Sequence, residues 1–564
     1  MKAILWFCLL FPLLIIPSFG NDISEAIIQY QADRGALMRK YTLTESEEYY
    51  ERFDKLYTDW QAALLTFDYE RLDRQGKVDY QLFKNFLDKE SYQLTVSRRD
   101  FERVKHLAHF ISPLRPFMIN RRRGDKPDPQ AVAGVMNDVK KSLIQYKKDL
   151  EKGGKPLESW QLAEKASAMV DNYKTVLTEA YKFYDGYDPE MTWWVERPFT
   201  DLAKEMEGYS AFLKEYYDNV NVKDDGSGII GRPIGREALI RGLRQEFIPY
   251  SPEELVEIAE KEFAWSEAEM KKASAELGFG DDWKQALESV KNTYFPLGEW
   301  PQEINRMAEE AVEFIESRDL ITIPDLAKES WRMRMLTPEE QKFAPFFLGG
   351  ESILIAYPTS TMSHEEKMMS LRGNNPHFSR AVVHHELIPG HHLQQFMNQR
   401  HKAYRSLFRT PFWTEGWALY WEMNLWEKDF PRSAEDKVGM LFWRMHRSAR
   451  IIFSLSYHLG TMTPQQSIDF LVDRVGHERD NAAAEVRRSF TGNYGPLYQI
   501  AYMIGGLQFK SLKEELVEGG QMSEKEFHDR VMRENSIPVA LVREILREED
   551  PNKDFTGDWR FYHR

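Results

Sequence analysis

Apolar residues recur at helical spacing through almost the whole chain, and residues that break helices are sparse. The stretch from Val132 to Leu150 is typical, because its apolar residues fall on one face and its Lys and Asp residues on the other. Breakers gather in short turns, of which residues 224–228, Asp-Asp-Gly-Ser-Gly, form the best linker candidate. A chain that is 42% hydrophobic and 13% aromatic can bury a large core, which excludes general disorder. We therefore predict a predominantly α-helical protein with a large bilobed body.

The pattern changes near residue 350, where a short β-strand is predicted. Residues 349–358 read GGESILIAYP, a run with β-branched residues that ends at a proline. Proline cannot donate to a strand ladder, so we expect this strand at the edge of a small antiparallel sheet. An edge strand can pair with an extended peptide, and a substrate could pair with residues 352–357 in this way.

The N-terminus has the pattern of a secretory signal, predicted to cover residues 1–20. Lys2 is followed by an apolar run from Ala3 to Pro17 and then by Ser-Phe-Gly. The run is short for a membrane span of about 20 residues, and an uncleaved anchor is the alternative. Phe7 precedes Cys8 where a lipoprotein signal needs a small residue, so lipidation is not expected. We expect an exported protein, periplasmic or extracellular, without stable membrane insertion after cleavage.

Charge and cysteine content exclude several classes of function. The net charge is -14, and sequence-independent nucleic-acid binding needs a basic surface, so a nucleic-acid partner is not expected. The single cysteine excludes a disulfide framework, a Cys-ligated zinc site and an iron–sulfur cluster. Cleavage of the signal would remove that cysteine, and a chain without thiols suits an oxidising compartment.

A histidine cluster is the strongest indication of chemistry in the sequence. Residues 384–392 read HHELIPGHH, which places four of the 14 histidines within nine residues. In zinc hydrolases the pattern His-Glu-x-x-His puts two imidazoles on one helix face with the Glu beside them as general base. Here His385 and His391 are six residues apart, so on a regular helix they would point about 120° apart. His392 would share a face with His385 but lie about 10 Å further along the axis.

Pro389 and Gly390 offer a way to bring the two histidines together. Proline cannot donate to the carbonyl of His385, and glycine permits backbone conformations that other residues avoid. We predict a broken helix with His385 and His391 as metal ligands and Glu386 as the general base. The flanking His384 and His392 are then expected behind the ligands or facing the substrate.

A third ligand is expected on a downstream apolar helix that carries two acids. Residues 412–422 read FWTEGWALYWE, in which Glu415 and Glu422 share a face. An acid on an aromatic helix face must be paired, bound to metal or protonated. We predict Glu415 as the third ligand and Glu422 as a residue that holds a ligand imidazole by its other nitrogen.

These two segments, HELIPGHHLQ from His385 and EGWALYWE from Glu415, closely resemble the DUF885 family. The resemblance runs from about residue 235 to about residue 506. It implies a divergent zincin-type metallopeptidase, with an active-site helix of that kind beside the small sheet. It also implies the same roles for His385, His391, Glu386 and Glu415.

Three further residues are assigned through similar family segments. The segment HLGTMTPQQ places His458, the segment PLYQIAYMIG places Tyr502, and the segment EVRR places Arg488. The resemblance gives His458 and Tyr502 as candidate donors to a reaction oxyanion. Arg488 is a candidate for holding a substrate carboxylate, and a salt bridge on its own helix is an equal alternative. The chain departs from the family pattern at Ser454, at residues 356–358 and at residues 496–498, and none of these changes touches the predicted metal ligands.

Together these observations predict an exported metallopeptidase with one Zn²⁺ that hydrolyses oligopeptides. The zinc would keep one position for water, which Glu386 activates. Two alternatives stay open: a non-haem Fe(II) enzyme that uses the same His/His/Glu triad, and a non-catalytic binding protein with a structural metal. The expected regions are the signal peptide (1–20), an N-terminal helical region (21–228), a helical region that continues into the catalytic body (229–345) and the zincin-like catalytic region (346–564).

Overall fold

The computed structural model describes residues 22–153, 157, 159–218, 224–296, 298–341, 347–492 and 494–563. The predicted signal peptide and Cys8 lie outside these ranges. The described chain is predominantly α-helical, as predicted. Contacts divide the chain into two compact units, Met1–Lys155 with Leu162–Lys214, and Pro156–Gln161 with Glu215–Arg564. The predicted regions 229–345 and 346–564 thus fall within one unit.

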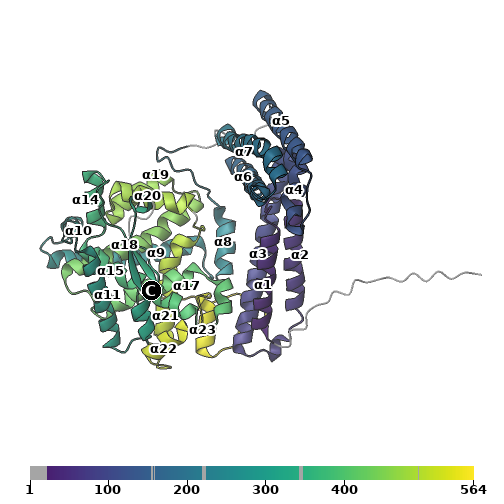
Figure 1. The fold of residues 1–564 in the computed structure, drawn as a ribbon. Helices are drawn as coiled ribbons and strands as arrows, with labels where there is room; N and C mark the ends of the chain where they lie inside the picture. The colour runs from purple at the N-terminus through teal and green to yellow at the C-terminus, as the bar shows by residue number, and fades with distance from the viewer. Residues whose placement is uncertain are drawn as a thin grey trace, which may run out of the picture. The chain divides into compact units, whose positions relative to one another are not determined.

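The first unit is built from long amphipathic helices, of which the first three in the chain, α1, α2 and α3, lie side by side in Figure 1. Asp22, Ser46 and Asp73 cap the first three helices through their side chains. The helices are α1 (Ile23–Lys40), α2 (Glu47–Leu64), α3 (Arg74–Val104), α4 (Arg115–Asn120), α5 (Pro129–Gly153), α6 (Trp160–Tyr184) and α7 (Pro189–Asp218), with short 3-10 helices at Tyr69–Arg71, Lys105–Leu114 and Arg121–Arg123.

The second unit contains the remaining helices and both strands, and it carries all the residues predicted for the site. Its helices are α8 (Gly235–Gln245), α9 (Pro252–Glu276), α10 (Trp283–Lys291), α11 (Trp300–Glu316), α12 (Asp325–Ser330), α13 (Pro338–Gln341), α14 (His364–Gly373), α15 (Pro376–Glu386), α16 (His391–Asn398), α17 (Pro411–Glu427), α18 (Ala434–His458), α19 (Pro464–Phe470), α20 (Arg479–Thr491), α21 (Tyr498–Lys513), α22 (Glu524–Met532) and α23 (Val539–Arg547), with a 3-10 helix at Ala403–Phe408 and π-helices at Leu471–Val475 and Glu514–Glu518.

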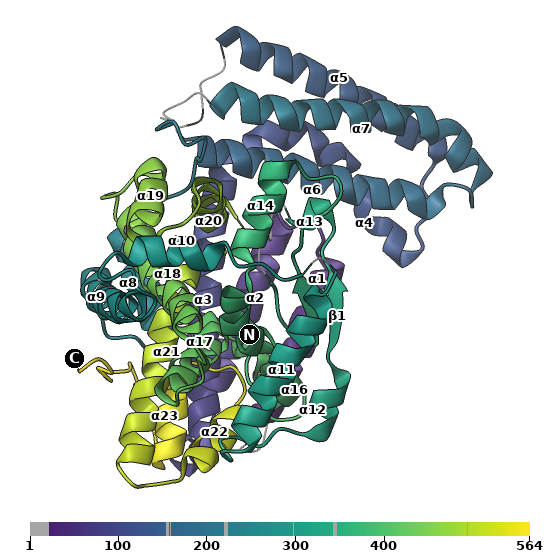
Figure 2. The same cartoon turned by 90° about the vertical axis from the view of Figure 1, so that its left-hand side faces the viewer.

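The core of this unit is formed by α17, α18 and α21, which lie together in Figure 2. Helix α17 is buried on every side from Phe412 to Leu425, as its lack of a polar face requires. It crosses α21 so closely that a Cβ on Gly505 would lie 1.9 Å from the carbonyl oxygen of Phe412. Gly416 faces Gly505 across the same crossing. The two glycines therefore allow the approach that sets Glu415, next to Gly416, against α21.

The strand predicted near residue 350 is present as β2 (Ser352–Ile355), and it pairs with β1 (Arg332–Met335). The predicted antiparallel sheet is wrong, because the two strands are parallel, with Arg332 opposite Ser352. The partner strand lies upstream and is reached by a crossover through α13, and its Arg-Met-Arg-Met sequence lacks the β-branched residues that mark a strand. On its other side, Leu354 of β2 forms an antiparallel bridge with Leu348, which occupies that edge at Leu354.

Among the helices that the structure describes, none combines the length and the apolar character needed to cross a membrane.

Candidate metal centre

The helix carrying the histidine cluster is broken where Pro389 and Gly390 predict it. Helix α15 ends at Glu386 and α16 begins at His391, and Leu387 and Gly390 between them have non-helical dihedral angles. The N–H of Gly390 donates to the carbonyl of His384 at 3.1 Å. A Cβ on Gly390 would lie 1.8 Å from the carbonyl oxygen of His385, so only glycine lets the chain fold back this tightly.

The fold-back brings His385 and His391 to Glu415 of α17. The ligand atoms of the three residues all lie within 4.8 Å of one another, and this is the one such group in the described part of the chain. The Nε2 atoms of His385 and His391 lie 3.6 Å and 3.3 Å from Oε2 of Glu415. Two ligands bound at about 2.1 Å to one tetrahedral ion lie about 3.4 Å apart. The three residues could therefore hold one metal ion.

The charges around these residues also fit a cation. Oε2 of Glu415 is buried without a hydrogen-bond partner, an arrangement that is costly unless a cation occupies the site. Burial favours the neutral imidazole of His385, yet the nearby carboxylates of Glu415 and Glu422 raise its pKa to about 9. Burial likewise opposes ionisation of Glu415, but His391 and His385 hold its pKa well below the usual range. The buried carboxylates are thus stabilised by a positive charge, which either a proton on the imidazoles or a metal ion supplies.

Glu422 lies behind His385, one face of α17 carrying both acids as expected. Its Oε1 accepts a hydrogen bond from Nδ1 of His385 at 2.6 Å, which leaves Nε2 directed at Glu415. A carboxylate on the outer nitrogen fixes the tautomer and the ring orientation of a metal-binding imidazole. The geometry therefore brings Glu422 to the position that the sequence predicts for it.

Glu386, the last residue of α15, lines the same cavity as the three potential ligands. This cavity has a volume of about 220 Å³. The Glu386 carboxylate lies against the backbone of Gly349, since a Cβ there would be 2.3 Å from Oε2. The N–H of Gly350 donates to the Glu386 carbonyl at 3.2 Å. Burial raises the pKa of Glu386 despite the nearby His385 and His391, which favours a group that can take up a proton.

Two tyrosines of α21 also face the cavity. The hydroxyl of Tyr498 donates a hydrogen bond to Oε1 of Glu415. The ring of Tyr502 stacks on that of His385, with 6.2 Å between centroids. Burial and the charge of Glu415 raise the pKa of Tyr502 to about 12, and burial also raises the pKa of Tyr498. Both phenols are therefore protonated at neutral pH and can act as hydrogen-bond donors.

Three predicted residues are not brought to this cavity. Nδ1 of His384 donates to the Arg380 carbonyl at 3.2 Å, and the His384 ring contacts that of Phe430. His392 donates through Nε2 to the carbonyl of Ala327 at 2.7 Å. His458, the last residue of α18, is buried beside aromatic rings, and burial lowers its pKa to about 4. None of the three lines the cavity, so their predicted roles stay predictions.

Sequence reasoning identified Arg488 but missed two arginines, Arg447 and Arg450, that line the cavity from α18. It also missed Tyr498, although Tyr494, Tyr498 and Tyr502 repeat every four residues and so predict one helix face. The signal for the arginines was their occurrence within a largely apolar helix, where a buried guanidinium requires a partner.

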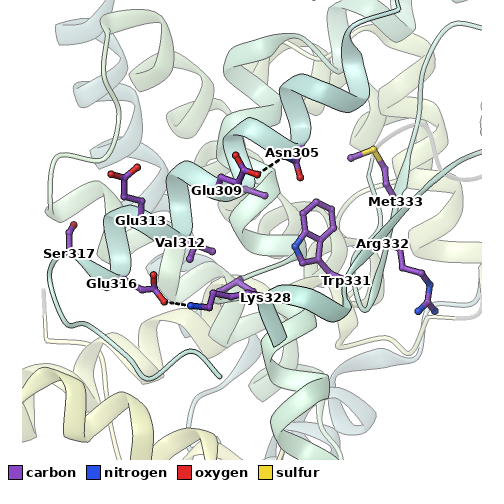
Figure 3. Close-up of a pocket in the computed structure, with 12 residues that line it drawn as sticks. Asn305, Glu309, Val312, Glu313, Glu316, Ser317, Lys328, Trp331, Arg332 and Met333 are labelled. Atoms are coloured by element: carbon purple, nitrogen blue, oxygen red, sulfur yellow. Dashed lines mark hydrogen bonds and ion pairs between the residues drawn. The ribbon is translucent and has the colours of Figure 1, made fainter. Parts of the chain in front are cut away.

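A second, larger cavity of about 850 Å³ lies between α11, Lys328 and β1 (Figure 3). Trp331 forms one wall, and Glu309, Glu313 and Glu316 lie along α11. Lys328 donates to Glu316 at 2.8 Å. The cavity reaches Ile388, which lies in the loop between His385 and His391, but it is lined by none of the three residues that could hold a metal ion.

A comparison with protein families shows which family the chain belongs to. The model of DUF885, a family described as bacterial proteins of unknown function, matches residues 34–546. The chain belongs to the DUF885 family. The match extends at both ends beyond residues 235–506, where the sequence motifs lie, so DUF885 includes most of both units.

Solved structures similar to this DUF885 protein show that the fold is shared. One is a "putative lipoprotein of unknown function" from Shewanella oneidensis, with 18% identity, a TM-score of 0.68, and coverage of 93% of this chain and 99% of that one. Another is a "putative lipoprotein" from Colwellia psychrerythraea, with 15% identity, a TM-score of 0.60, and coverage of 93% and 98%. No curated protein matches the chain.

Proposed function

We propose that this DUF885 protein is a zinc-dependent metallopeptidase that hydrolyses peptide bonds of oligopeptides. The observation that carries the proposal is the convergence of His385, His391 and Glu415 in one cavity that Glu386 also lines. Three protein ligands with space beside them are typical of catalytic zinc sites, whereas structural sites are closed by four. The small volume of the cavity favours a flexible peptide over a folded protein as substrate.

In this proposal each residue has a distinct task. A zinc ion held by the three ligands would act as a Lewis acid towards the scissile carbonyl and lower the pKa of water. Glu386 accepts the proton of the attacking water and passes it to the leaving amine, a role that its raised pKa suits. Glu422 keeps His385 oriented through its 2.6 Å hydrogen bond.

Tyr502 is the donor that we propose for the oxyanion formed during the attack. Its ring stacks on His385 and it lines the cavity, whereas Tyr498 is already bonded to Glu415. A donor placed where negative charge develops contributes about 3–4 kcal/mol in comparable sites. His458 has no part in the proposed mechanism, because it lies outside the cavity lining.

The same triad would also suit Fe(II), but a facial iron triad has no use for an acid beside it. Glu386 in the cavity therefore favours hydrolysis over oxygen chemistry and over a purely structural metal.

The function is tested by digestion of a peptide library that is read by mass spectrometry. We expect cleavage that a chelator abolishes and that Zn²⁺ restores. Elemental analysis of protein purified without added metal should give one zinc per chain. Metal-independent cleavage, or one iron per chain with no cleavage, would overturn the proposal.

We also propose that the protein is exported. The N-terminal sequence supports this, and so do the similar proteins from Shewanella and Colwellia, which carry the description of lipoproteins. We expect the mature chain to begin at Asn21, and the intact mass of the protein from its native host measures this. A mature chain that begins at an acylated Cys8, or one that retains residues 1–20, would contradict the predicted cleavage.

A further inference from the structure

Besides Arg409, three arginines from α18 and α20 line the cavity that holds the candidate metal centre. Arg447 and Arg450 come from adjacent turns of α18, and Arg488 comes from α20. The guanidinium carbons of Arg447 and Arg450 lie 4.7 Å and 4.6 Å from the centroid of the Tyr502 ring. Since that ring stacks on His385, a single aromatic ring links the arginines to the metal centre.

These three arginines outnumber the carboxylates that form salt bridges with them. Nε of Arg450 donates to Glu485 at 2.7 Å, and the same carboxylate lies 3.4 Å from Nε of Arg488. Among the described residues, the salt bridge of Arg447 is to Glu422, at 3.6 Å, and Glu422 already accepts from His385. Two carboxylates thus serve three guanidinium groups, and one of the two is shared with the metal centre.

The excess of arginines over carboxylates is accompanied by unsatisfied hydrogen-bond donors. Nε of Arg447, Nη1 of Arg450 and Nε of Arg488 are buried and have no hydrogen-bond partner. Arg447 and Arg450 are only 5% and 3% exposed, so solvent does not satisfy them. A buried charged donor without a partner costs free energy that a bound anion recovers.

The chemistry of the donors indicates which anion fits. Guanidinium groups recognise planar carboxylates through paired N–H donors, and such bonds are about twice as strong as neutral ones. A substrate carboxylate in this cavity would lie close to the bond being cleaved, because Arg447, Arg450 and Glu386 line one volume of about 220 Å³.

We propose that Arg447, Arg450 and Arg488 bind a carboxylate of the peptide substrate, so that the enzyme selects peptides with a negative charge beside the scissile bond. This inference rests on the proposed function, since it takes the ligand to be a peptide. A free C-terminus and an acidic side chain supply the same group. The first would make the enzyme an exopeptidase that acts from the C-terminal end.

Binding is measured first, so that the result does not depend on hydrolysis. The probes are the short peptide Ac-Ala-Ala with a free C-terminal acid and the same peptide as a C-terminal amide. Calorimetric titration of the full-length Glu386→Gln chain loaded with Zn²⁺, which should not hydrolyse the probes, should show the acid binding at least about 10-fold more tightly than the amide. Equal affinity for the two would overturn the inference.

Variants then assign the effect to the arginines. Arg450→Gln should remove most of the preference for the acid. If that variant does not fold, Arg488→Gln, at a less buried position, is the variant to measure. Arg444→Gln is the matched control, because Arg444 lies one turn away on α18 but contacts Glu262 and Trp265 outside the cavity. The control should keep the preference. A preference that survives in both Arg450→Gln and Arg488→Gln would overturn the assignment.

A hydrolysis assay distinguishes failure of this inference from failure of the proposed peptidase function on which it rests. Four peptide libraries, with acid or amide ends and with or without Asp and Glu, distinguish the sources of the carboxylate. We expect the neutral amide library to be cleaved at least about 10-fold more slowly than the others. Equal cleavage of all four overturns the inference and leaves the peptidase intact. Selective binding of the acid without any cleavage overturns the peptidase and supports the carboxylate site.

Discussion

Glu386→Gln is expected to lower kcat for peptide hydrolysis by about 100- to 10,000-fold, the range over which a positioned general base contributes. Glutamine keeps the size and shape of the side chain but cannot accept the proton of the attacking water. Glu386 is outside the group of three potential ligands, so the metal should stay bound. Steady-state kinetics and elemental analysis of the same preparation measure the two quantities together.

The structure also predicts that Glu386→Gln folds well. Burial raises the pKa of Glu386, which means that the folded protein does not favour its charged form, and a neutral amide removes that burden. The matched control is Glu351→Gln, which changes an exposed carboxylate paired with Arg332 and should leave hydrolysis unchanged. Full activity in Glu386→Gln would exclude Glu386 as the base. Loss of metal together with activity would instead make it a ligand.

The candidate metal centre was predictable from the sequence because its main elements are local. The interruption by Pro389 and Gly390 changes the spacing of His385 and His391 in a way that follows from the geometry of one helix. Glu415 and Glu422 could be placed because an acid in an otherwise apolar helix requires a partner. These arguments need no knowledge of how distant helices pack.

The walls of the cavity were less predictable because they depend on contacts between distant helices. Tyr498 meets Glu415 only because α17 and α21 cross at Gly416 and Gly505. The periodicity of α21 identifies a tyrosine face, but it does not say what that face contacts. His458 was assigned by resemblance alone, and the structure places it at the end of α18, away from the cavity.

Within the nine residues of the histidine cluster, too, one feature could be predicted from the sequence and another could not. Periodicity fails across the break, so the sequence alone does not determine which of two adjacent histidines faces the ligand group. In the structure His391 lies 3.3 Å from Oε2 of Glu415, whereas its neighbour His392 donates to the carbonyl of Ala327 and does not line the cavity. Substitution of each histidine in turn therefore tests the fold-back directly.

His391→Asn is expected to abolish tight metal binding, and His392→Asn is expected to preserve it. Loss of an outer-sphere partner of a metal ligand typically costs 10- to 100-fold in affinity, and loss of a ligand should cost more. At a free Zn²⁺ concentration 100 times the dissociation constant, the wild-type protein gains about 2.7 kcal/mol of stability. If the affinity falls about 100-fold, that gain falls to about 0.4 kcal/mol. Thermal unfolding with and without Zn²⁺ measures the difference.

The two variants are compared by the stability that each gains on adding Zn²⁺, because either substitution can change the stability of the metal-free protein. His392 is buried and hydrogen-bonded, so His392→Asn should unfold at a lower temperature without metal and still recover the full gain with it. His391→Asn should show little gain at any starting stability. The reverse result would place His392 in the metal centre. The break at Pro389 and Gly390 would then not fold the chain as described, and the proposed hydrolase would lose the site on which it depends.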